Sequence, residues 1–131
     1  MKQLEQARIL LAKALEDEQA AAALADDERI GDSIIGFHCQ QAGEKLLKAL
    51  LSARAVVFRH THNLGALIDV LEQSGYAFPD DLRALGSLTR FAVEFRYDLF
   101  EEPGTFDRRA ALETIRRLRE LAEAEVAGAA Q

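Results

Sequence analysis

The sequence has 131 residues, of which 49% are hydrophobic and 29% charged, and its formal net charge is -6. This length suits one domain with its own hydrophobic core, and the composition excludes a disordered chain. Because the excess of acidic side chains repels phosphate backbones, any contact with nucleic acid must be local, and no DNA partner is expected.

The first half of the chain predicts two long helices. Residues 2–24 carry apolar side chains three or four positions apart, and the acidic stretch 25–28 after them predicts a turn. Asp32 or Ser33 can cap a second helix that runs to about Arg54, and we expect this helix to be central. The apolar stripe of the first helix is Leu4, Ala7, Leu11, Ala14 and Leu15, and that of the second is Ile35, Cys39, Ala42, Leu46, Ala49, Leu50 and Ala53.

Three further helices are predicted in the second half. Their first residues or caps are Thr61 or Asn63, Pro79, and Thr105 or Asp107, respectively. Gly75 supplies a left-handed residue that ends the third helix, the fourth stops before Pro103, and the tail at 127–131 is expected to fray. The apolar stripes are Leu64, Leu67, Ile68 and Leu71; Leu82, Leu85, Leu88, Ala92, Phe95 and Leu99; and Leu112, Ile115, Leu118 and Ala122.

Helical periodicity along nearly the whole chain, without a run of alternating β-branched residues, predicts an all-α fold. Five amphipathic helices joined by short loops form an antiparallel bundle, here a single domain over residues 1–131. The one cysteine excludes an intramolecular disulfide, and the N-terminus lacks the uninterrupted apolar stretch of a signal peptide. The apolar runs are far shorter than the roughly 20 residues that cross a bilayer. We therefore expect a cytoplasmic protein without a membrane partner.

The second helix also carries a polar stripe on the side opposite its apolar stripe. Gln41, Glu44, Lys45 and Lys48 lie there at spacings of three and four, and we expect this side to be free for binding. An amide that donates and accepts hydrogen bonds, with two ammonium groups within a turn of it, suits a phosphate or an amide-rich partner. The alternative is an ordinary Glu44–Lys48 ion pair, worth only about 0.3–0.5 kcal/mol.

Two histidines, His60 and His62, stand at the predicted start of the third helix. The free N–H groups of a helix start attract anions, and a histidine adds a further donor. A metal site is disfavoured, because the pair supplies two ligands and no Cys or carboxylate cluster nearby completes a tetrahedral set. The Glu-x-x-His spacing of di-iron bundles is also absent from the sequence, so no cofactor is expected. The alternative to an anion site is that one histidine caps or packs in the loop.

Arg96 and Tyr97 form a third candidate site near the predicted end of the fourth helix. Arg96 has a permanent charge and a planar fork that suits phosphate, and Tyr97 can stack a base or donate its hydroxyl. The alternative is that Arg96 pairs with Glu94, Asp98 or a helix C-terminus.

The order of three segments, FHCQQAGEKLLKALL, HTHNLGALI and LTRFAVEFRYDL, closely resembles the HEPN domain family (higher eukaryotes and prokaryotes nucleotide-binding). The resemblance implies five helices built on an up-and-down four-helix bundle with an additional helix, usually in a dimer. It also implies a bacterial module that acts beside a minimal nucleotidyltransferase, as a complex or a toxin–antitoxin pair. The family pattern places nucleotide- or partner-binding residues at Gln41, Glu44, Lys45, Lys48, His62, Arg96 and Tyr97.

One departure from the family pattern bears on catalysis. Many members are thought to be metal-independent ribonucleases in which an Arg stabilises the charged phosphorane and a His, about four to six residues later, works as acid or base. Here the last histidine is His62, so none follows Arg96, and Asp98 stands where a Pro often follows the Arg-Tyr pair. Arg54 and His60 have the spacing but lie after the second helix, which is the wrong place. We therefore expect no catalytic residues, and a ribonuclease toxin is the less favoured alternative.

The favoured hypothesis is a noncatalytic, dimeric module that binds nucleotide or RNA and partners a nucleotidyltransferase. Leu47 and Leu51 lie beside the polar stripe of the second helix, and we expect them to form the dimer seam. A third possibility is a purely structural dimer whose polar stripe is solvated.

Overall fold

The computed structural model describes residues 2–93 and 106–131, which form five helices and no strand, so the predicted all-α class is confirmed. The helices are α1 (Lys2–Leu24), α2 (Asp32–Ala53), α3 (Leu64–Gln73), the 3₁₀ helix η1 (Asp80–Val93) and α4 (Arg108–Ala129). Within the described ranges, no helix combines the length and the apolar character that a membrane crossing requires.

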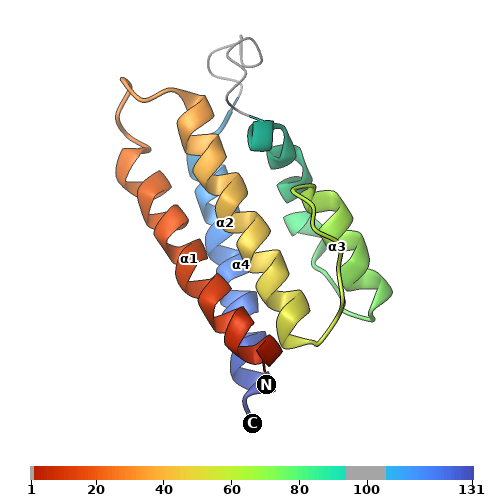
Figure 1. The fold of residues 1–131 in the computed structure, drawn as a ribbon. Helices are drawn as coiled ribbons and strands as arrows, with labels where there is room; N and C mark the ends of the chain where they lie inside the picture. The colour runs from red at the N-terminus through yellow and green to blue at the C-terminus, as the bar shows by residue number, and fades with distance from the viewer. Residues whose placement is uncertain (1, 94–105) are drawn as a thin grey trace.

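The three long helices α1, α2 and α4 run side by side, and α3 and η1 lie together on one side of them (Figure 1). In chain order α1, α2, η1 and α4 alternate in direction, which makes the up-and-down bundle, and α3 is the additional helix. The start of α1 and the end of α4 lie at the same end of the bundle. Since α2 packs against each of the other four helices, it is the central element, as the sequence predicts.

The core contains most of the predicted apolar positions. On α2 the predicted stripe from Ile35 to Leu50 is at most 1% exposed, and the predicted stripe of α3 is at most 2% exposed. Leu15 on α1 is the exception among the larger side chains, because it is 39% exposed and its predicted place in the core is wrong. Leu11 and Leu112 are only partly buried and pack against the edge of the core.

Leu47 and Leu51, the residues of the predicted dimer seam, are fully buried within the chain itself. The prediction is wrong because α2 is enclosed by four other helices, so its flanks are covered as well as its apolar stripe. A pattern with one apolar side and one polar side is typical of a helix at the surface of a bundle, whereas α2 lies in the middle of this bundle.

Side-chain caps fix the starts of α3 and α4. The Asn63 side chain accepts a hydrogen bond from the Ala66 N–H at 3.1 Å, and Asp107 accepts one from the Ala110 N–H at 3.0 Å. Gly75 follows α3 with φ of 96°, the left-handed conformation that the sequence predicts there. At the other end of α4, helix continues through residues 127–129, and fraying of this tail stays a prediction.

The start of α2 differs from its prediction, because Gly31 takes the cap position and makes no side-chain capping bond. Asp32 is instead the first helical residue, and its Oδ1 accepts a hydrogen bond from Nε of Arg108 at 2.8 Å. Nη1 of the same guanidinium donates to the carbonyl of Ala25 at 3.0 Å. The Asp32 carboxylate therefore binds Arg108 of α4, and Gly31 occupies the cap position of α2.

η1 is a 3₁₀ helix, where the sequence predicts an ordinary helix. Its buried side chains recur at every third position and are at most 5% exposed: Leu82, Leu85, Leu88 and Phe91. A 3₁₀ helix has three residues per turn, so side chains three apart lie on one face. The buried residue after Leu88 is therefore Phe91, whereas the sequence predicts Ala92 at this place in the core. Phe95, Leu99 and the candidate cap Thr105 lie outside the described residues.

Candidate functional site

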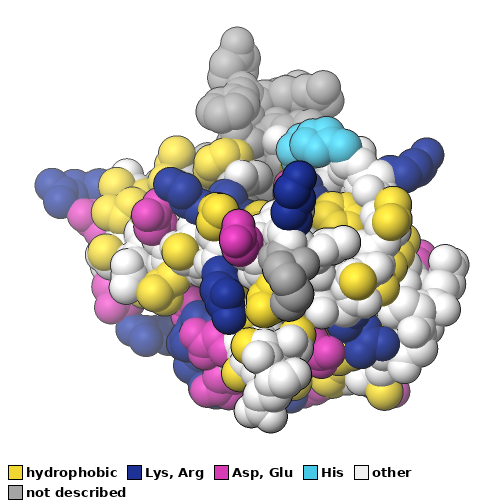
Figure 2. Space-filling view, turned by 60° about the horizontal axis from the view of Figure 1, so that its bottom comes forward, with side chains coloured by type: hydrophobic (Ala, Val, Ile, Leu, Met, Phe, Trp, Pro, Cys, Tyr) yellow, Lys and Arg dark blue, Asp and Glu magenta, His cyan; other side chains and the backbone are white. Residues whose placement is uncertain are grey.

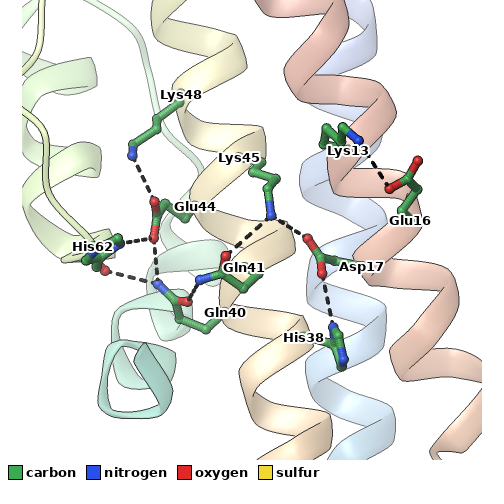
Figure 3. A network of polar contacts seen from close by, with 10 residues as sticks. All are labelled: Lys13, Glu16, Asp17, His38, Gln40, Gln41, Glu44, Lys45, Lys48 and His62. Atoms are coloured by element: carbon green, nitrogen blue, oxygen red, sulfur yellow. Dashed lines mark hydrogen bonds and ion pairs between the residues drawn. The ribbon is translucent and has the colours of Figure 1, made fainter. Parts of the chain in front are cut away.

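The polar side chains of α2 form a network beneath the surface. Glu44 and Lys48 are 7% and 8% exposed, so the expectation that they lie on a free face is wrong. They are covered because the loop before α3 crosses this side of α2 and brings His62 onto Glu44. Figure 3 shows the network, which joins side chains of α1, of α2 and of that loop.

Glu44 is the centre of the network. Its Oε1 accepts a hydrogen bond from Nε2 of Gln40 at 3.0 Å and lies 2.9 Å from Nδ1 of His62. Its Oε2 accepts one from Nζ of Lys48 at 2.8 Å, which is the ion pair across one turn that the sequence offers as an alternative. Gln40 also donates to the backbone carbonyl of His62 at 3.1 Å, so both the ring and the backbone of His62 are held.

The electrostatics of this cluster keep Glu44 ionised. Burial raises the pKa of its carboxyl, but hydrogen bonds from Lys48, His62 and Gln40 outweigh that effect and hold the pKa below its ordinary value. An ionised carboxylate only accepts hydrogen bonds, so Nδ1 of His62 carries the proton that it shares with Glu44. Because the His62 side chain is 59% exposed, its other nitrogen, Nε2, is left for solvent or a ligand.

The network continues from Gln40 to α1. Gln41 donates from Nε2 to Oε1 of Gln40 at 2.7 Å, and Nζ of Lys45 donates to Oε1 of Gln41 at 3.4 Å. Asp17 on α1 accepts from Nζ of Lys45 at 2.6 Å, and its other oxygen lies 3.0 Å from Nδ1 of His38. Gln41 and Lys45 are therefore engaged in joining α2 to α1.

The network includes three residues that the sequence does not predict, Gln40, Asp17 and His38. Gln40 is fully buried, and its position one turn before Glu44 is a local signal that could have revealed it. Asp17 and Lys45 are 28 residues apart along the chain, so no local pattern predicts their contact.

The loop above Glu44 presents a basic surface. Arg59, His60 and His62 are exposed there, and the two imidazole rings meet edge to face with centroids 5.4 Å apart. Figure 2 shows histidine side chains gathered at this surface, with Lys or Arg side chains close by. We call this loop surface, together with the Glu44–Lys48 pair beneath it, the His62 site. Exposed imidazole and guanidinium groups are donors that suit phosphate oxygens.

Metal binding and the Arg96–Tyr97 pair are the two remaining expectations from the sequence. Over residues 2–93 and 106–131, no three Cys, His, Asp or Glu side chains are grouped so that they would hold a metal ion. Arg96 and Tyr97, the other predicted binding residues, lie outside the described residues.

Comparison with known proteins gives one match. The family model described as "HEPN domain" matches residues 7–128, a range that includes the whole His62 site and nearly all of the bundle. No curated protein and no solved structure matches the chain.

Proposed function

The chain belongs to the HEPN domain family, a nucleotide- or RNA-related helical module, and we propose that it binds the phosphate of a nucleotide or RNA at the His62 site without cleaving it. The observation that carries this proposal is the imidazole of His62, which is 59% exposed yet fixed through Nδ1 by the buried carboxylate of Glu44. Nε2 donates to a phosphate oxygen when the ring carries both protons, and a donor whose position is fixed before the ligand arrives loses little freedom on binding.

The charges of the site support an anionic ligand. Lys48 and Glu44 neutralise each other below the surface, so the permanent charge that a ligand meets is that of Arg59, with the imidazoles of His60 and His62 beside it. A buried ion pair is weak evidence for stability by itself, since desolvation offsets much of its Coulomb energy. Its effect here is to hold the His62 ring in place.

A labelled single-stranded RNA and the full chain test this proposal by fluorescence anisotropy. His62→Ala should weaken binding about tenfold, because a hydrogen bond to a charged group contributes about 1.5 kcal/mol or more. The matched control is Arg8→Ala, which removes an exposed positive charge on α1 and should change binding little. Equal losses in the two variants would mean that net charge alone governs binding, and the site would then be wrong.

We further propose that the protein is a homodimer that partners a minimal nucleotidyltransferase in a two-component or toxin–antitoxin system. Membership of the family supports this, and Arg96 with Tyr97 are proposed as additional contacts to ligand or partner. Capture of partners on the tagged protein from its own cell extract should recover a nucleotidyltransferase at a fixed ratio. A monomeric mass of the purified chain in solution would contradict the dimer.

RNA cleavage is a second candidate, and one observation favours it. A carboxylate that orients an imidazole with its other nitrogen exposed is the arrangement of a general acid–base group, as Glu44 and His62 have it. It is the less favoured candidate because no histidine follows Arg96. A nuclease assay of the parent, His62→Ala and Arg96→Ala decides between the two: intact RNA with the parent excludes cleavage, and cleavage abolished by His62→Ala replaces the binding proposal.

A further inference from the structure

A pocket of about 210 Å³ opens between η1 and α4 and shares no lining residue with the His62 site. Alanines lie on both sides, with Ala84 on η1 and Ala110 and Ala111 on α4, and Phe106 is also among the lining residues. Pockets that enclose drug-sized ligands measure about 300–1,000 Å³, so this one fits a single ring system. Short side chains on two sides favour a flat group, against which the ring of Phe106 can stack.

Three polar side chains of this pocket, Ser87, Asp107 and Thr114, present hydrogen-bond acceptors, and the fourth, Arg90, has its guanidinium over the Phe91 ring, 4.7 Å from the centroid. The hydroxyl of Ser87 donates to the carbonyl of Ala84 at 2.8 Å, and that of Thr114 donates to the carbonyl of Ala110 at 2.9 Å. Because their protons are used within their own helices, both oxygens have only lone pairs to offer a ligand. Asp107 accepts the Ala110 N–H through Oδ1, and its carboxylate has further lone pairs.

On the premise that the protein binds nucleotide or RNA, we propose that this pocket receives a guanine base. The Watson–Crick edge of guanine carries an N–H and an amino group side by side, and this pair of donors matches the carboxylate of Asp107 with Ser87 and Thr114 around it. Single-stranded RNA is commonly read through such unstacked bases, which stack on aromatic rings and bond through that edge.

Isothermal titration of the full chain with guanosine monophosphate tests the pocket. Ala110→Leu places a larger side chain in the pocket from an exposed position of α4, and it should weaken binding at least about tenfold. The control is Ala124→Leu, the same change at another exposed position of α4 outside the pocket, which should bind like the parent. Unchanged affinity in Ala110→Leu would overturn the proposal.

A second variant tests the choice of base. Asp107→Asn keeps an effective cap for α4, because Asn and Asp are equally good at this position, but it sets an amide group against the guanine donors. We expect the preference for guanosine over adenosine monophosphate to be lost, and a retained preference would contradict the role of Asp107.

The two proposals fail in different ways. If the parent binds RNA but not guanosine monophosphate, the guanine pocket is wrong, and the His62 site is then judged by the comparison of His62→Ala with Arg8→Ala. If the parent binds neither RNA nor any nucleotide, both proposals are wrong. If both Ala110→Leu and His62→Ala weaken RNA binding while their controls do not, the two sites act on one ligand.

Discussion

Glu44 and Lys48 form an ion pair that folding removes from water, and its energetic role differs from that of a surface pair. Glu44→Gln leaves the Lys48 ammonium buried without a counter-charge, so the free energy of unfolding should fall by about 3 kcal/mol. Urea unfolding of the parent and the variant measures this difference.

The exposed pair Lys13–Glu16, also drawn in Figure 3, provides the control. Its side chains are 59% and 69% exposed, so Glu16→Gln should change the free energy of unfolding by less than about 0.5 kcal/mol. Similar losses of unfolding free energy in Glu44→Gln and Glu16→Gln would contradict the prediction that burial makes the Glu44–Lys48 pair more costly to break.

The lowered pKa of Glu44 predicts how this contribution depends on pH. Its folded pKa lies below the ordinary value of 4.5, so the folded state is favoured while the carboxyl is ionised. This stabilisation is fully present above about pH 4.5 and is lost as the pH falls through the folded pKa. The difference in unfolding free energy between the parent and Glu44→Gln should therefore shrink on acidification. A difference that stays constant between about pH 7 and pH 3 would contradict the prediction.

Only part of the His62 site can be predicted from sequence at this scale. The Glu44–Lys48 contact follows from a spacing of four on one helix, and the choice of His62 as a candidate binding residue follows from the family resemblance. That His62 lies on Glu44, which is 18 residues away, depends on the path of the loop between α2 and α3. The burial of this pair likewise depends on what covers α2, which no local pattern contains.

The contact between α2 and η1 depends on one glycine. A Cβ atom at Gly36 would lie 2.4 Å from Cε1 of the Phe91 ring, which is itself 1% exposed in the core, so the ring or the helix would have to shift. Gly36→Ala gains about 1 kcal/mol of helix propensity, yet overpacking of the core costs about 1–3 kcal/mol and occasionally more. We expect a net loss of stability, measured as a lower urea midpoint.

Gly86 on η1 gives the matched control, since a Cβ atom there meets nothing within 4 Å. Gly86→Ala should raise the free energy of unfolding by about 0.5 kcal/mol, because alanine loses less backbone freedom on folding. If Gly36→Ala were as stable as Gly86→Ala, the close packing of Phe91 on α2 would be wrong.

Helix positions follow from the sequence more closely than helix types or neighbours do. The bounds of α1 agree with the predicted 2–24, because apolar spacing marks where a helical face begins and ends. The same spacing allowed two interpretations for η1, since residues three apart share a face in both an α-helix and a 3₁₀ helix. The same spacing places Leu15 of α1 in the core, whereas it is exposed, because spacing alone does not tell which of two adjacent apolar stripes faces the bundle.

At the scale of the whole molecule, the enclosure of α2 explains both the success and the errors of sequence interpretation. The sequence predicts a central helix, but its two-sided pattern places Leu47 and Leu51 at the surface, whereas the structure buries both. The four surrounding helices meet α2 through contacts between distant parts of the chain. Such contacts decide which polar groups are buried, and amphipathic periodicity does not encode them.

Arg108, at the start of α4, joins α4 to the loop between α1 and α2. From the first residue of α4 it donates to the carboxylate of Asp32 at 2.8 Å and to the carbonyl of Ala25 at 3.0 Å, and also to the carbonyl of Ile30. Its side chain is 18% exposed, so the loop between α1 and α2 depends on bonds that water does not readily replace.

Arg108→Gln should therefore loosen this loop more than it weakens the bundle. The loop contains the exposed Arg29, where trypsin cleaves, so the variant should be cut there several-fold faster than the parent under native conditions. Arg109→Gln is the control, because Arg109 is 80% exposed and its pair with Asp26 contributes little. Equal cleavage rates in the two variants would mean that the backbone of the loop holds its own conformation. Faster cleavage in Arg108→Gln alone would show that a side chain 76 residues away from Asp32 fixes the start of the central helix.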